Sequence, residues 1–291
     1  MEQIMPRFRR SQRREKDAAA IVGSLSYLVP GDGKPCSYAF EPPEGVPWEN
    51  CAYEWRPVPI EDGRHAPGKA SLQREGFELW DAPTEVEDFL DEEEVRSVYY
   101  PECAELALAA TGASRAYVFD HLVRRREADR PPLNFGRGSR GKVASANGRI
   151  HNDYTEASGR RRLELVVQDA HTRRHVRRFS IVNVWRSIRG PVLDTPLAVC
   201  DARTVHPSDL VSSEVRYRNR TGEIYFVAYS PRHRWTYYSA MDRHEALVFK
   251  QYDSQADVSR FTPHAAFDHP HTPADAPLRE SIELRCLVTY D

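Results

Sequence analysis

The sequence lacks several features that would assign a function at once. Its five cysteines, Cys36, Cys51, Cys103, Cys200 and Cys286, are widely spaced and form no CxxC pair. An odd number with this spacing argues against a disulfide framework or a structural zinc site and favours a reducing cytoplasm. Apolar runs stay shorter than the roughly 18 residues of a membrane-spanning helix. The basic N-terminus lacks the apolar region of a secretory signal.

An excess of charge of one sign is also missing. The 41 basic and 43 acidic residues leave a net charge of -2, so no overall field attracts nucleic acid or a membrane surface. Basic runs such as 124–126 and 160–162 lack the interleaved aromatic residues of a stacking platform, and we expect them on solvated faces. No glycine-rich phosphate-binding motif occurs, so nucleotide binding is not expected either.

Prolines, by contrast, are abundant. The 21 prolines are spread through the chain and separate short apolar runs, which is typical of a β-rich fold with many turns. A polar loop is predicted at 131–149 and a helix at 156–170. The series of runs favours a sandwich or jelly roll over a doubly wound α/β sheet. Strands are predicted at 115–125, 149–154, 177–188, 196–205, 222–230, 233–240, 245–254 and 280–290.

The N-terminal third is less regular. Strands are predicted at 18–29 and 75–83. A helix is predicted at 88–110 with an interruption near Pro101, and its early glutamates suit the helix dipole. The Pro-rich and aromatic stretch 33–60 indicates a packed loop.

The stretch "RIHNDYTEAS" at 149–158 contains the first candidate for a metal site. In a strand, residues i and i+2 point to the same face, so His151 and Asp153 face together while Asn152 points away. An imidazole and a carboxylate are two ligands of the 2-His-1-carboxylate triad, which suits non-haem Fe(II). In a chain with 11 histidines the pair alone is weak support, because such a spacing also arises by chance.

A third ligand must come from farther along the chain. His264 is the best candidate because it lies between the strands predicted at 245–254 and 280–290. His269 and His271 are themselves spaced i, i+2, but prolines surround them and a solvated loop is the simpler interpretation. Whether either takes part in the metal site stays open. The other downstream histidines are His171, His175, His206, His233 and His244.

The last strand begins with an R-x-S pattern formed by Arg279 and Ser281. These two side chains share one face of a strand, and a guanidinium with a hydroxyl can hold a carboxylate. The distal carboxylate of 2-oxoglutarate would fit there while its keto acid chelates iron. A surface salt bridge with Glu280 or Glu283 is the competing explanation for Arg279. The order of HxD, distal histidine and R-x-S favours an Fe(II)/2-oxoglutarate oxygenase.

Longer blocks of the sequence resemble a known family. "FSIVNVWRSIRGPVLDTPLAVCDARTV", "YSPRHRWTYYSAMDRHEALVFKQYDS" and "RFTPHAAFDHP" followed by "RESIELRCLVTY" resemble blocks of the AsaB-like hydroxylase/desaturase family. That family includes CmcJ-like proteins and is similar to the aziridine-forming TqaL-like enzymes. The resemblance covers about residues 115 to 291 well and the N-terminal third loosely. "NVWRS" and "DYTEAS" depart from the family pattern. We therefore expect an altered loop on the substrate side and unchanged iron chemistry.

The resemblance implies a double-stranded β-helix, a jelly-roll or cupin-like core, that uses Fe(II), 2-oxoglutarate and O2. By position it implies His151, Asp153 and His264 as metal ligands and Arg279 and Ser281 as the 2-oxoglutarate site. We expect a mainly β single domain with helices over 1–291. In it, the helical and irregular region 1–112 would support a β-helix core at 113–291.

Five further residues are candidates for binding co-substrate or substrate. Asn183 and Arg186 lie on opposite faces of strand 177–188, so one of them can face the pocket. Arg234 and Tyr238 share a face of strand 233–240 and could bind a substrate carboxylate. Tyr117 is a candidate for the pocket wall. Packing in the core is the competing explanation for these strand residues.

Two hypotheses follow. The first is an oxygenase that attacks a C–H bond of a small specialised metabolite or amino-acid-derived substrate by hydroxylation, desaturation or oxidative cyclisation such as aziridine formation. Succinate and CO2 would be its co-products. The second is a non-catalytic β-barrel that binds a ligand or partner and has lost turnover. We expect a small-molecule substrate, with neither nucleic acid nor a membrane as partner. The oligomeric state stays open, a homodimer being one option.

Overall fold

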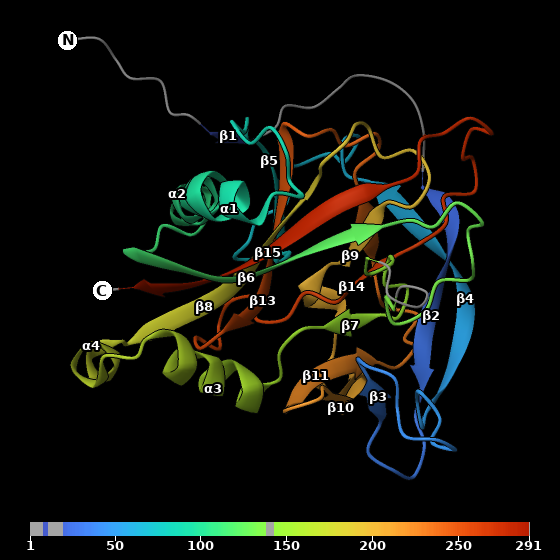
Figure 1. Ribbon diagram of the computed structural model, residues 1–291, viewed down its shortest axis with the longest axis horizontal. Helices are drawn as coiled ribbons and strands as arrows, with labels where there is room; N and C mark the ends of the chain where they lie inside the picture. Colours follow the sequence, from blue (N-terminus) through green and yellow to red (C-terminus); the bar gives the residue numbers. More distant parts are fainter. Residues whose placement is uncertain (1–7, 11–19, 138–142, 291) are drawn as a thin grey trace.

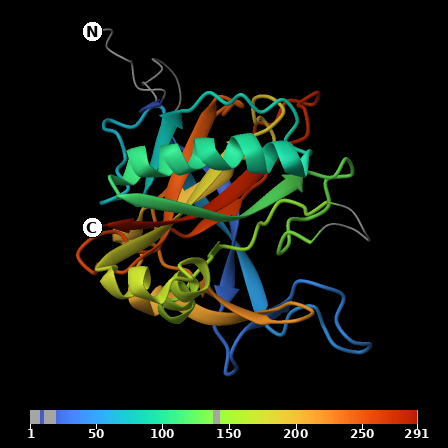
Figure 2. The same cartoon turned by 60° about the vertical axis from the view of Figure 1, so that its left-hand side comes forward.

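The computed structural model describes residues 8–10, 20–137 and 143–290, which form two β-sheets and a few helices. The sheets face each other, and the longest helix covers the outer face of one of them (Figure 1, Figure 2). Within these described ranges, no helix combines the length and the apolar character needed to cross a membrane.

The two sheets differ in size and in the length of their strands. The first has the order β1 (Arg9–Arg10), β5 (Phe77–Asp81), β13 (Glu245–Asp253), β8 (Arg178–Ser187), β15 (Glu280–Tyr290) and β6 (Arg115–Arg125). The second has the order β2 (Ile21–Val29), β4 (Ala52–Asp62), β12 (Trp235–Tyr237), β9 (Leu197–Cys200), β14 (His264–Ala266), β7 (His151–Asn152), β11 (Thr221–Val227), β10 (Leu210–Arg216) and β3 (Cys36–Tyr38).

A buried apolar cluster joins the two sheets. Phe77, Trp185 and Phe249 of the first sheet pack against Leu197 and Val199 of the second. These side chains form a core between two β layers, as in a sandwich or jelly roll. The long strands β6, β8, β13 and β15 follow the predicted ranges closely, so the period-2 pattern of the sequence is a good guide there. Strands β7, β9 and β12 are shorter than predicted.

The two faces of strand β15 have different surroundings. Its alternate residues Leu284 and Cys286 pack in a cluster with Leu106 and Ala107 of the helix α2 (Tyr100–Thr111). The intervening residues Ser281, Glu283 and Arg285 therefore face the space between the sheets, since successive side chains point to opposite faces. Polar groups are rarely buried in a row, so the space beside these three residues is a candidate functional region.

The helix predicted at 88–110 starts at Glu92, and Pro101 does not interrupt it. Helix α1 (Glu92–Glu94) continues through a π-helical turn (Val95–Tyr99) into α2. The wider turn comes just before Pro101, which lacks an N–H for the helix ladder, and this local change of the hydrogen-bond pattern accommodates the proline within the helix.

The other helices lie in the second half of the chain. The predicted helix 156–170 appears as α3 (Glu156–Val166), followed by the short α4 (Ala170–His175).

The interpretation of 33–60 as a loop is wrong for its second half. Strand β4 pairs with β2 along all nine residues of β2, with Gly23 opposite Val58. Pro57 and Pro59 misled the prediction because proline cannot donate to a sheet ladder. Both lie where the other neighbour, β12, does not pair, since β12 contacts only Ile60–Asp62. Strands β1, β3, β10 and β14 were also not predicted.

Asn152 holds the short strand β7 in place. Its side-chain amide donates to the carbonyl oxygens of Tyr154 (2.7 Å) and Gln251 (2.9 Å), and its Oδ1 accepts from the backbone N–H of Thr262 (3.0 Å). The side chain is fully buried. As the sequence predicted, it points away from His151 and Asp153, and it connects β7 with β13 and with the segment that leads into β14.

Replacing this amide should therefore destabilise the protein. Asn152→Ala leaves buried backbone groups without partners, and we expect the free energy of unfolding to fall by about 2–4 kcal/mol. Denaturant unfolding followed by circular dichroism measures the change. Asn219→Ala, at an exposed turn, is the control and should change it by less than about 0.5 kcal/mol. Equal stability of the two variants would contradict this role.

Candidate metal centre

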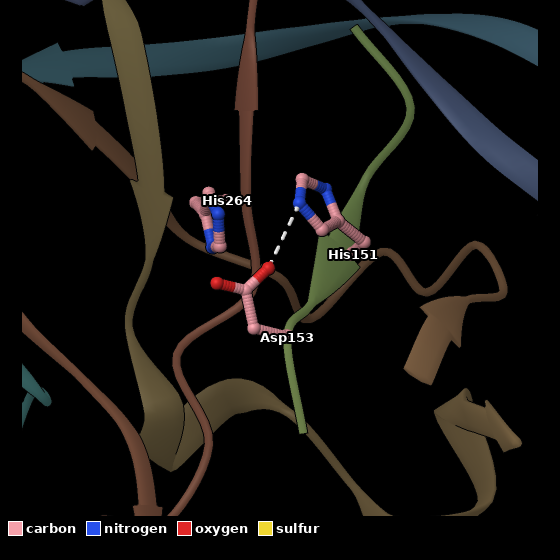
Figure 3. A group of neighbouring side chains, drawn as sticks. All are labelled: His151, Asp153 and His264. Atoms are coloured by element: carbon pink, nitrogen blue, oxygen red, sulfur yellow. Dashed lines mark ion pairs between the residues drawn. The ribbon is translucent and has the colours of Figure 1, made fainter. Parts of the chain in front are cut away.

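His151 and His264 are cross-strand neighbours. Strand β7 pairs antiparallel with β14, and the register places these two residues directly opposite each other. Direct partners have Cβ atoms about 5 Å apart, and the two rings lie 4.3 Å apart between centroids. Asp153 follows β7 and points toward both rings (Figure 3). One potential ligand atom from each of the three residues lies within 4.8 Å of the others.

In both imidazoles Nε2 is the atom that can bind a metal ion. His151 Nε2 lies 3.4 Å from Asp153 Oδ1 and 3.3 Å from Asn147 Nδ2. His151 Nδ1 lies 2.8 Å from the carbonyl oxygen of Arg149, and His264 Nδ1 lies 3.3 Å from that of Thr262. A carbonyl can only accept, so we assign the proton to Nδ1 in each ring, which leaves Nε2 with its lone pair. His264 Nε2 is buried and has no partner among the described residues. Burial lowers the pKa of His264 to about 3, so this ring is neutral at physiological pH, as metal binding requires.

Asp153 is held by one of its two oxygens. Oδ2 accepts from Asn183 Nδ2 and from Arg285 Nε, both at 2.9 Å, while Oδ1 lies 3.4 Å from His151 Nε2. Burial alone would raise the pKa of this carboxyl, but the charge of the neighbouring Arg285 guanidinium outweighs burial and holds the pKa well below its usual range. The carboxylate is therefore ionised and offers Oδ1 to a cation.

The donor set fits Fe(II). Two neutral imidazole nitrogens and one carboxylate oxygen, presented from one side, are the ligands of the 2-His-1-carboxylate triad. These are three protein ligands, so an octahedral ion would keep further positions for other molecules.

Sequence reasoning missed Glu283 and Arg285 as residues of this centre. Arg285 donates to Asp153, to Asp120 Oδ2 (3.0 Å) and to Glu283 Oε1 (2.8 Å), so one guanidinium contacts three carboxylates. Glu283 Oε2 lies 4.0 Å from His264 Nε2, and burial raises the pKa of the Glu283 carboxyl. Continuing the period of two from Arg279 and Ser281 along the strand would have found both residues.

Arg279 and Ser281 are buried with unsatisfied polar atoms. Arg279 Nη1 donates to the carbonyl oxygen of Thr195 (3.0 Å), but Arg279 Nε and Ser281 Oγ have no partner among the described residues. Burial lowers the pKa of Arg279 to about 10, so the guanidinium stays protonated at neutral pH. A buried donor without an acceptor is costly, and a carboxylate between the two side chains would satisfy both.

Of the two candidates on β8, the structure brings only Asn183 to the centre, where it contacts Asp153. Arg186 is on the opposite face of the sheet, fully buried beneath the helices. It donates to Tyr99 Oη (3.0 Å) and to the carbonyl oxygens of Ala82 and Arg243 (both 2.9 Å). All of these partners are structural, so Arg186 stabilises the fold on the far side of the sheet from the metal centre.

The remaining candidates also lie away from the cluster. Arg234 is exposed. Tyr238 packs in the apolar cluster between the sheets and borders a separate cavity of about 170 Å³. Tyr117 is half-buried against the cluster that contains Tyr154. His269 Nε2 lies 3.2 Å from Tyr237 Oη, outside the metal cluster.

A large open cavity of about 1340 Å³ leads to the centre and reaches His151 and Asp153. Its wall is formed by β6, by the loop that carries Phe135 and Asn147, by α3, and by the β10–β11 hairpin. Tyr154 and residues of the first turns of α3 also line it. The segment after the HxD motif is therefore part of the cavity wall.

Arg285 should be a positioning residue for the metal ligand Asp153. Arg285→Gln removes the charge that keeps this carboxylate oriented and ionised, so we expect Fe(II) affinity to fall by about 10- to 100-fold. Anaerobic equilibrium dialysis with a colorimetric iron assay measures the affinity. Arg189→Gln, which removes an exposed arginine paired with Glu280, is the matched control. Unchanged affinity in Arg285→Gln would exclude the role.

Comparisons with known proteins agree with this geometry. A family model described as "Oxidoreductase/YMDC permease-like domain" matches residues 25–289. The hydroxylase/desaturase efuI of Hormonema carpetanum is 34% identical over 255 residues, which cover 82% of this chain and 85% of that protein. The hydroxylase/desaturase asaB of Aspergillus flavus is 40% identical over 129 residues, or 39% of this chain and 56% of that protein.

A solved structure shows the same fold. The iron and alpha-ketoglutarate-dependent endoperoxidase NvfI superposes with a TM-score of 0.81 at 26% identity, covering 93% of this chain and 98% of that one. The expected mainly β, jelly-roll core is thus confirmed, and so is the resemblance stated from the sequence blocks. The likeness to aziridine-forming enzymes stays a prediction. The chain belongs to the hydroxylase/desaturase family of non-haem Fe(II)/2-oxoglutarate-dependent oxygenases.

Proposed function

We propose that His151, Asp153 and His264 hold Fe(II), and that Arg279 and Ser281 bind the distal carboxylate of 2-oxoglutarate. The protein is a non-haem dioxygenase that uses Fe(II), 2-oxoglutarate and O2. Together these supply the oxidising power to break a substrate C–H bond, with succinate and CO2 as co-products. The substrate is a small specialised metabolite or an amino-acid-derived molecule.

One observation carries the proposed metal site. Two imidazole Nε2 atoms and one carboxylate oxygen converge inside the protein, and each ligand is oriented by a hydrogen bond from its other side. An empty cluster of this kind would leave His264 Nε2 buried without a partner, at a cost in stability. A bound cation removes that cost.

The chain's own residues have to position the substrate and limit access of water. The cavity beside His151 and Asp153 provides the space, and aromatic side chains such as Phe119 and Phe135 line it. No side-chain acid or base is required by this chemistry. Tyr154 and the start of α3 lie in the wall, so we propose that the segment after the HxD motif contributes to substrate preference.

Hydroxylation, desaturation and oxidative cyclisation are all compatible with this site, and the outcome depends on how the substrate is held. We further propose a cytoplasmic enzyme, since all five cysteines are free thiols. The single-domain organisation over 1–291 stays part of the proposal, and so does the absence of a nucleic-acid partner. The rival hypothesis, a barrel without turnover, gives no reason for the buried polar atoms without partners at His264 Nε2, Arg279 Nε and Ser281 Oγ.

The metal assignment predicts a clear difference among three histidines. His264→Ala should abolish stoichiometric Fe(II) binding because it removes one of three ligands. His269→Ala and His271→Ala should leave binding unchanged because neither lies in the cluster. Metal analysis of the protein prepared without air and reconstituted with Fe(II) measures this. Full iron content in His264→Ala would overturn the assignment.

The co-substrate assignment predicts a separable effect. Arg279→Gln should bind Fe(II) normally but weaken 2-oxoglutarate binding by about tenfold or more, because a charge-assisted contact is lost. The visible metal-to-ligand charge-transfer band in an anaerobic titration reports this affinity. Arg125→Gln, beside Glu280 on the neighbouring strand, is the matched control. Absence of the band and of succinate release in the wild type would instead favour the barrel without turnover.

A further inference from the structure

We propose that Arg124 binds a carboxylate of the substrate, so that this enzyme acts on an acid with an apolar body. The inference rests on the proposed function, because it assigns the substrate class of the same site. It starts from the register of the first sheet, in which Arg124 of β6 lies directly opposite Ser281 of β15. Arg124 therefore faces the same interior as Ser281 and Glu283.

The guanidinium of Arg124 is anchored at one nitrogen only. Nη1 lies 2.9 Å from the carbonyl oxygen of Ser145 and 3.4 Å from that of Gly136. A Cβ at position 136 would lie 2.2 Å from Nη1, and the φ of 75° there also favours glycine, so Gly136 permits this approach. Arg124 Nε and Nη2 make no hydrogen bond to any residue in the described part of the chain. The anchored group therefore keeps donors for a ligand.

Arg124 differs from Arg285 in its contacts with carboxylates. Arg285 contacts the carboxylates of Asp153, Glu283 and Asp120, and Arg279 is assigned to 2-oxoglutarate. Arg124 has no carboxylate within ion-pair distance among the described residues. Arg124 is half-buried in the cavity wall, and a guanidinium that loses its water when a ligand fills the cavity is costly without a counter-ion. An anionic substrate would provide that counter-ion.

Two sources of a carboxylate have to be distinguished, since 2-oxoglutarate also carries one. The position of Arg124 favours the substrate. Arg124 lines the large cavity that reaches His151 and Asp153, whereas Arg279 and Ser281 are not among the described residues of its wall. A molecule that enters the cavity thus meets Arg124, while the proposed 2-oxoglutarate clamp lies deeper.

The surroundings of Arg124 suggest the rest of the ligand. Leu122 lies two residues away on the same strand face, and Phe119 and Phe135 are also in the cavity wall. Together with Arg124, these apolar and aromatic side chains suit a ligand that has an apolar part and an acidic end. Charged residues elsewhere in the wall, such as Arg137 and Arg162, allow further polar groups on the ligand. The same pocket would discriminate against the uncharged analogue, because that ligand would displace water from the guanidinium without supplying a counter-ion.

The test compares an acid with its amide. Under anaerobic conditions, with Fe(II) and saturating 2-oxoglutarate, 4-phenylbutyrate and 4-phenylbutanamide are titrated calorimetrically into wild type, Arg124→Gln and Arg125→Gln. Arg125 is the next residue on β6 and pairs with Glu280, so it is a matched control. Wild type and Arg125→Gln should bind the acid about tenfold or more tightly than the amide. Arg124→Gln should lose this preference, and Arg124→Lys should retain part of it.

Several outcomes would overturn the inference. Equal binding of acid and amide by the wild type would do so, and so would an unchanged preference in Arg124→Gln. A tenfold loss of 2-oxoglutarate affinity in Arg124→Gln, read from the charge-transfer band without the probe, would assign Arg124 to the co-substrate instead. Failure of the proposed function is distinct, because the wild type would then form no charge-transfer band. If Arg124→Gln does not fold, Arg124→Lys decides, since it keeps the charge and should keep a reduced preference.

Discussion

The centre of this protein depends on the pairing of two very short strands. Strand β7 has two residues and β14 has three, yet their register sets His151 opposite His264. A slip by one residue would turn one imidazole to the other face of the sheet. Asn152, between the two candidate ligands of β7, points the other way and ties the strand to its surroundings through three hydrogen bonds. His151 and Asp153 thus face the metal site, while Asn152 between them fixes the position of the strand.

Strand β15 connects the stability of the fold with its chemistry. One face is apolar and packs with α2, and the other carries polar groups into the interior. Buried charges are stable only when they are paired, and Arg285 achieves this with Asp153 and Glu283. Arg279 and Ser281, on the same face, retain unsatisfied atoms. Arg285, whose hydrogen bonds are made within the protein, orients the metal-binding residue Asp153. Arg279 and Ser281, whose hydrogen bonds are not all made, are available to bind a small molecule.

The accuracy of the sequence-based predictions follows from how local each feature is. Strands with alternating apolar residues, such as 177–188 and 280–290, were predicted within a few residues because their period is visible in the chain itself. Strand β14 is too short to show a period. Strand β4 carries Pro57 and Pro59, which usually exclude a central strand and are accommodated here only because part of its edge is unpaired.

Local spacing and order along the chain were enough to select His151, Asp153 and His264, and to place Arg279 and Ser281 together on the last strand. They could not show which of the β8 candidates faces the centre, nor that Arg285 and Arg124 belong to it. Arg124 and Ser281 are far apart in sequence and meet only because β6 pairs with β15 in one register. Such neighbours depend on long-range strand pairing, and no local pattern in the chain specifies that pairing.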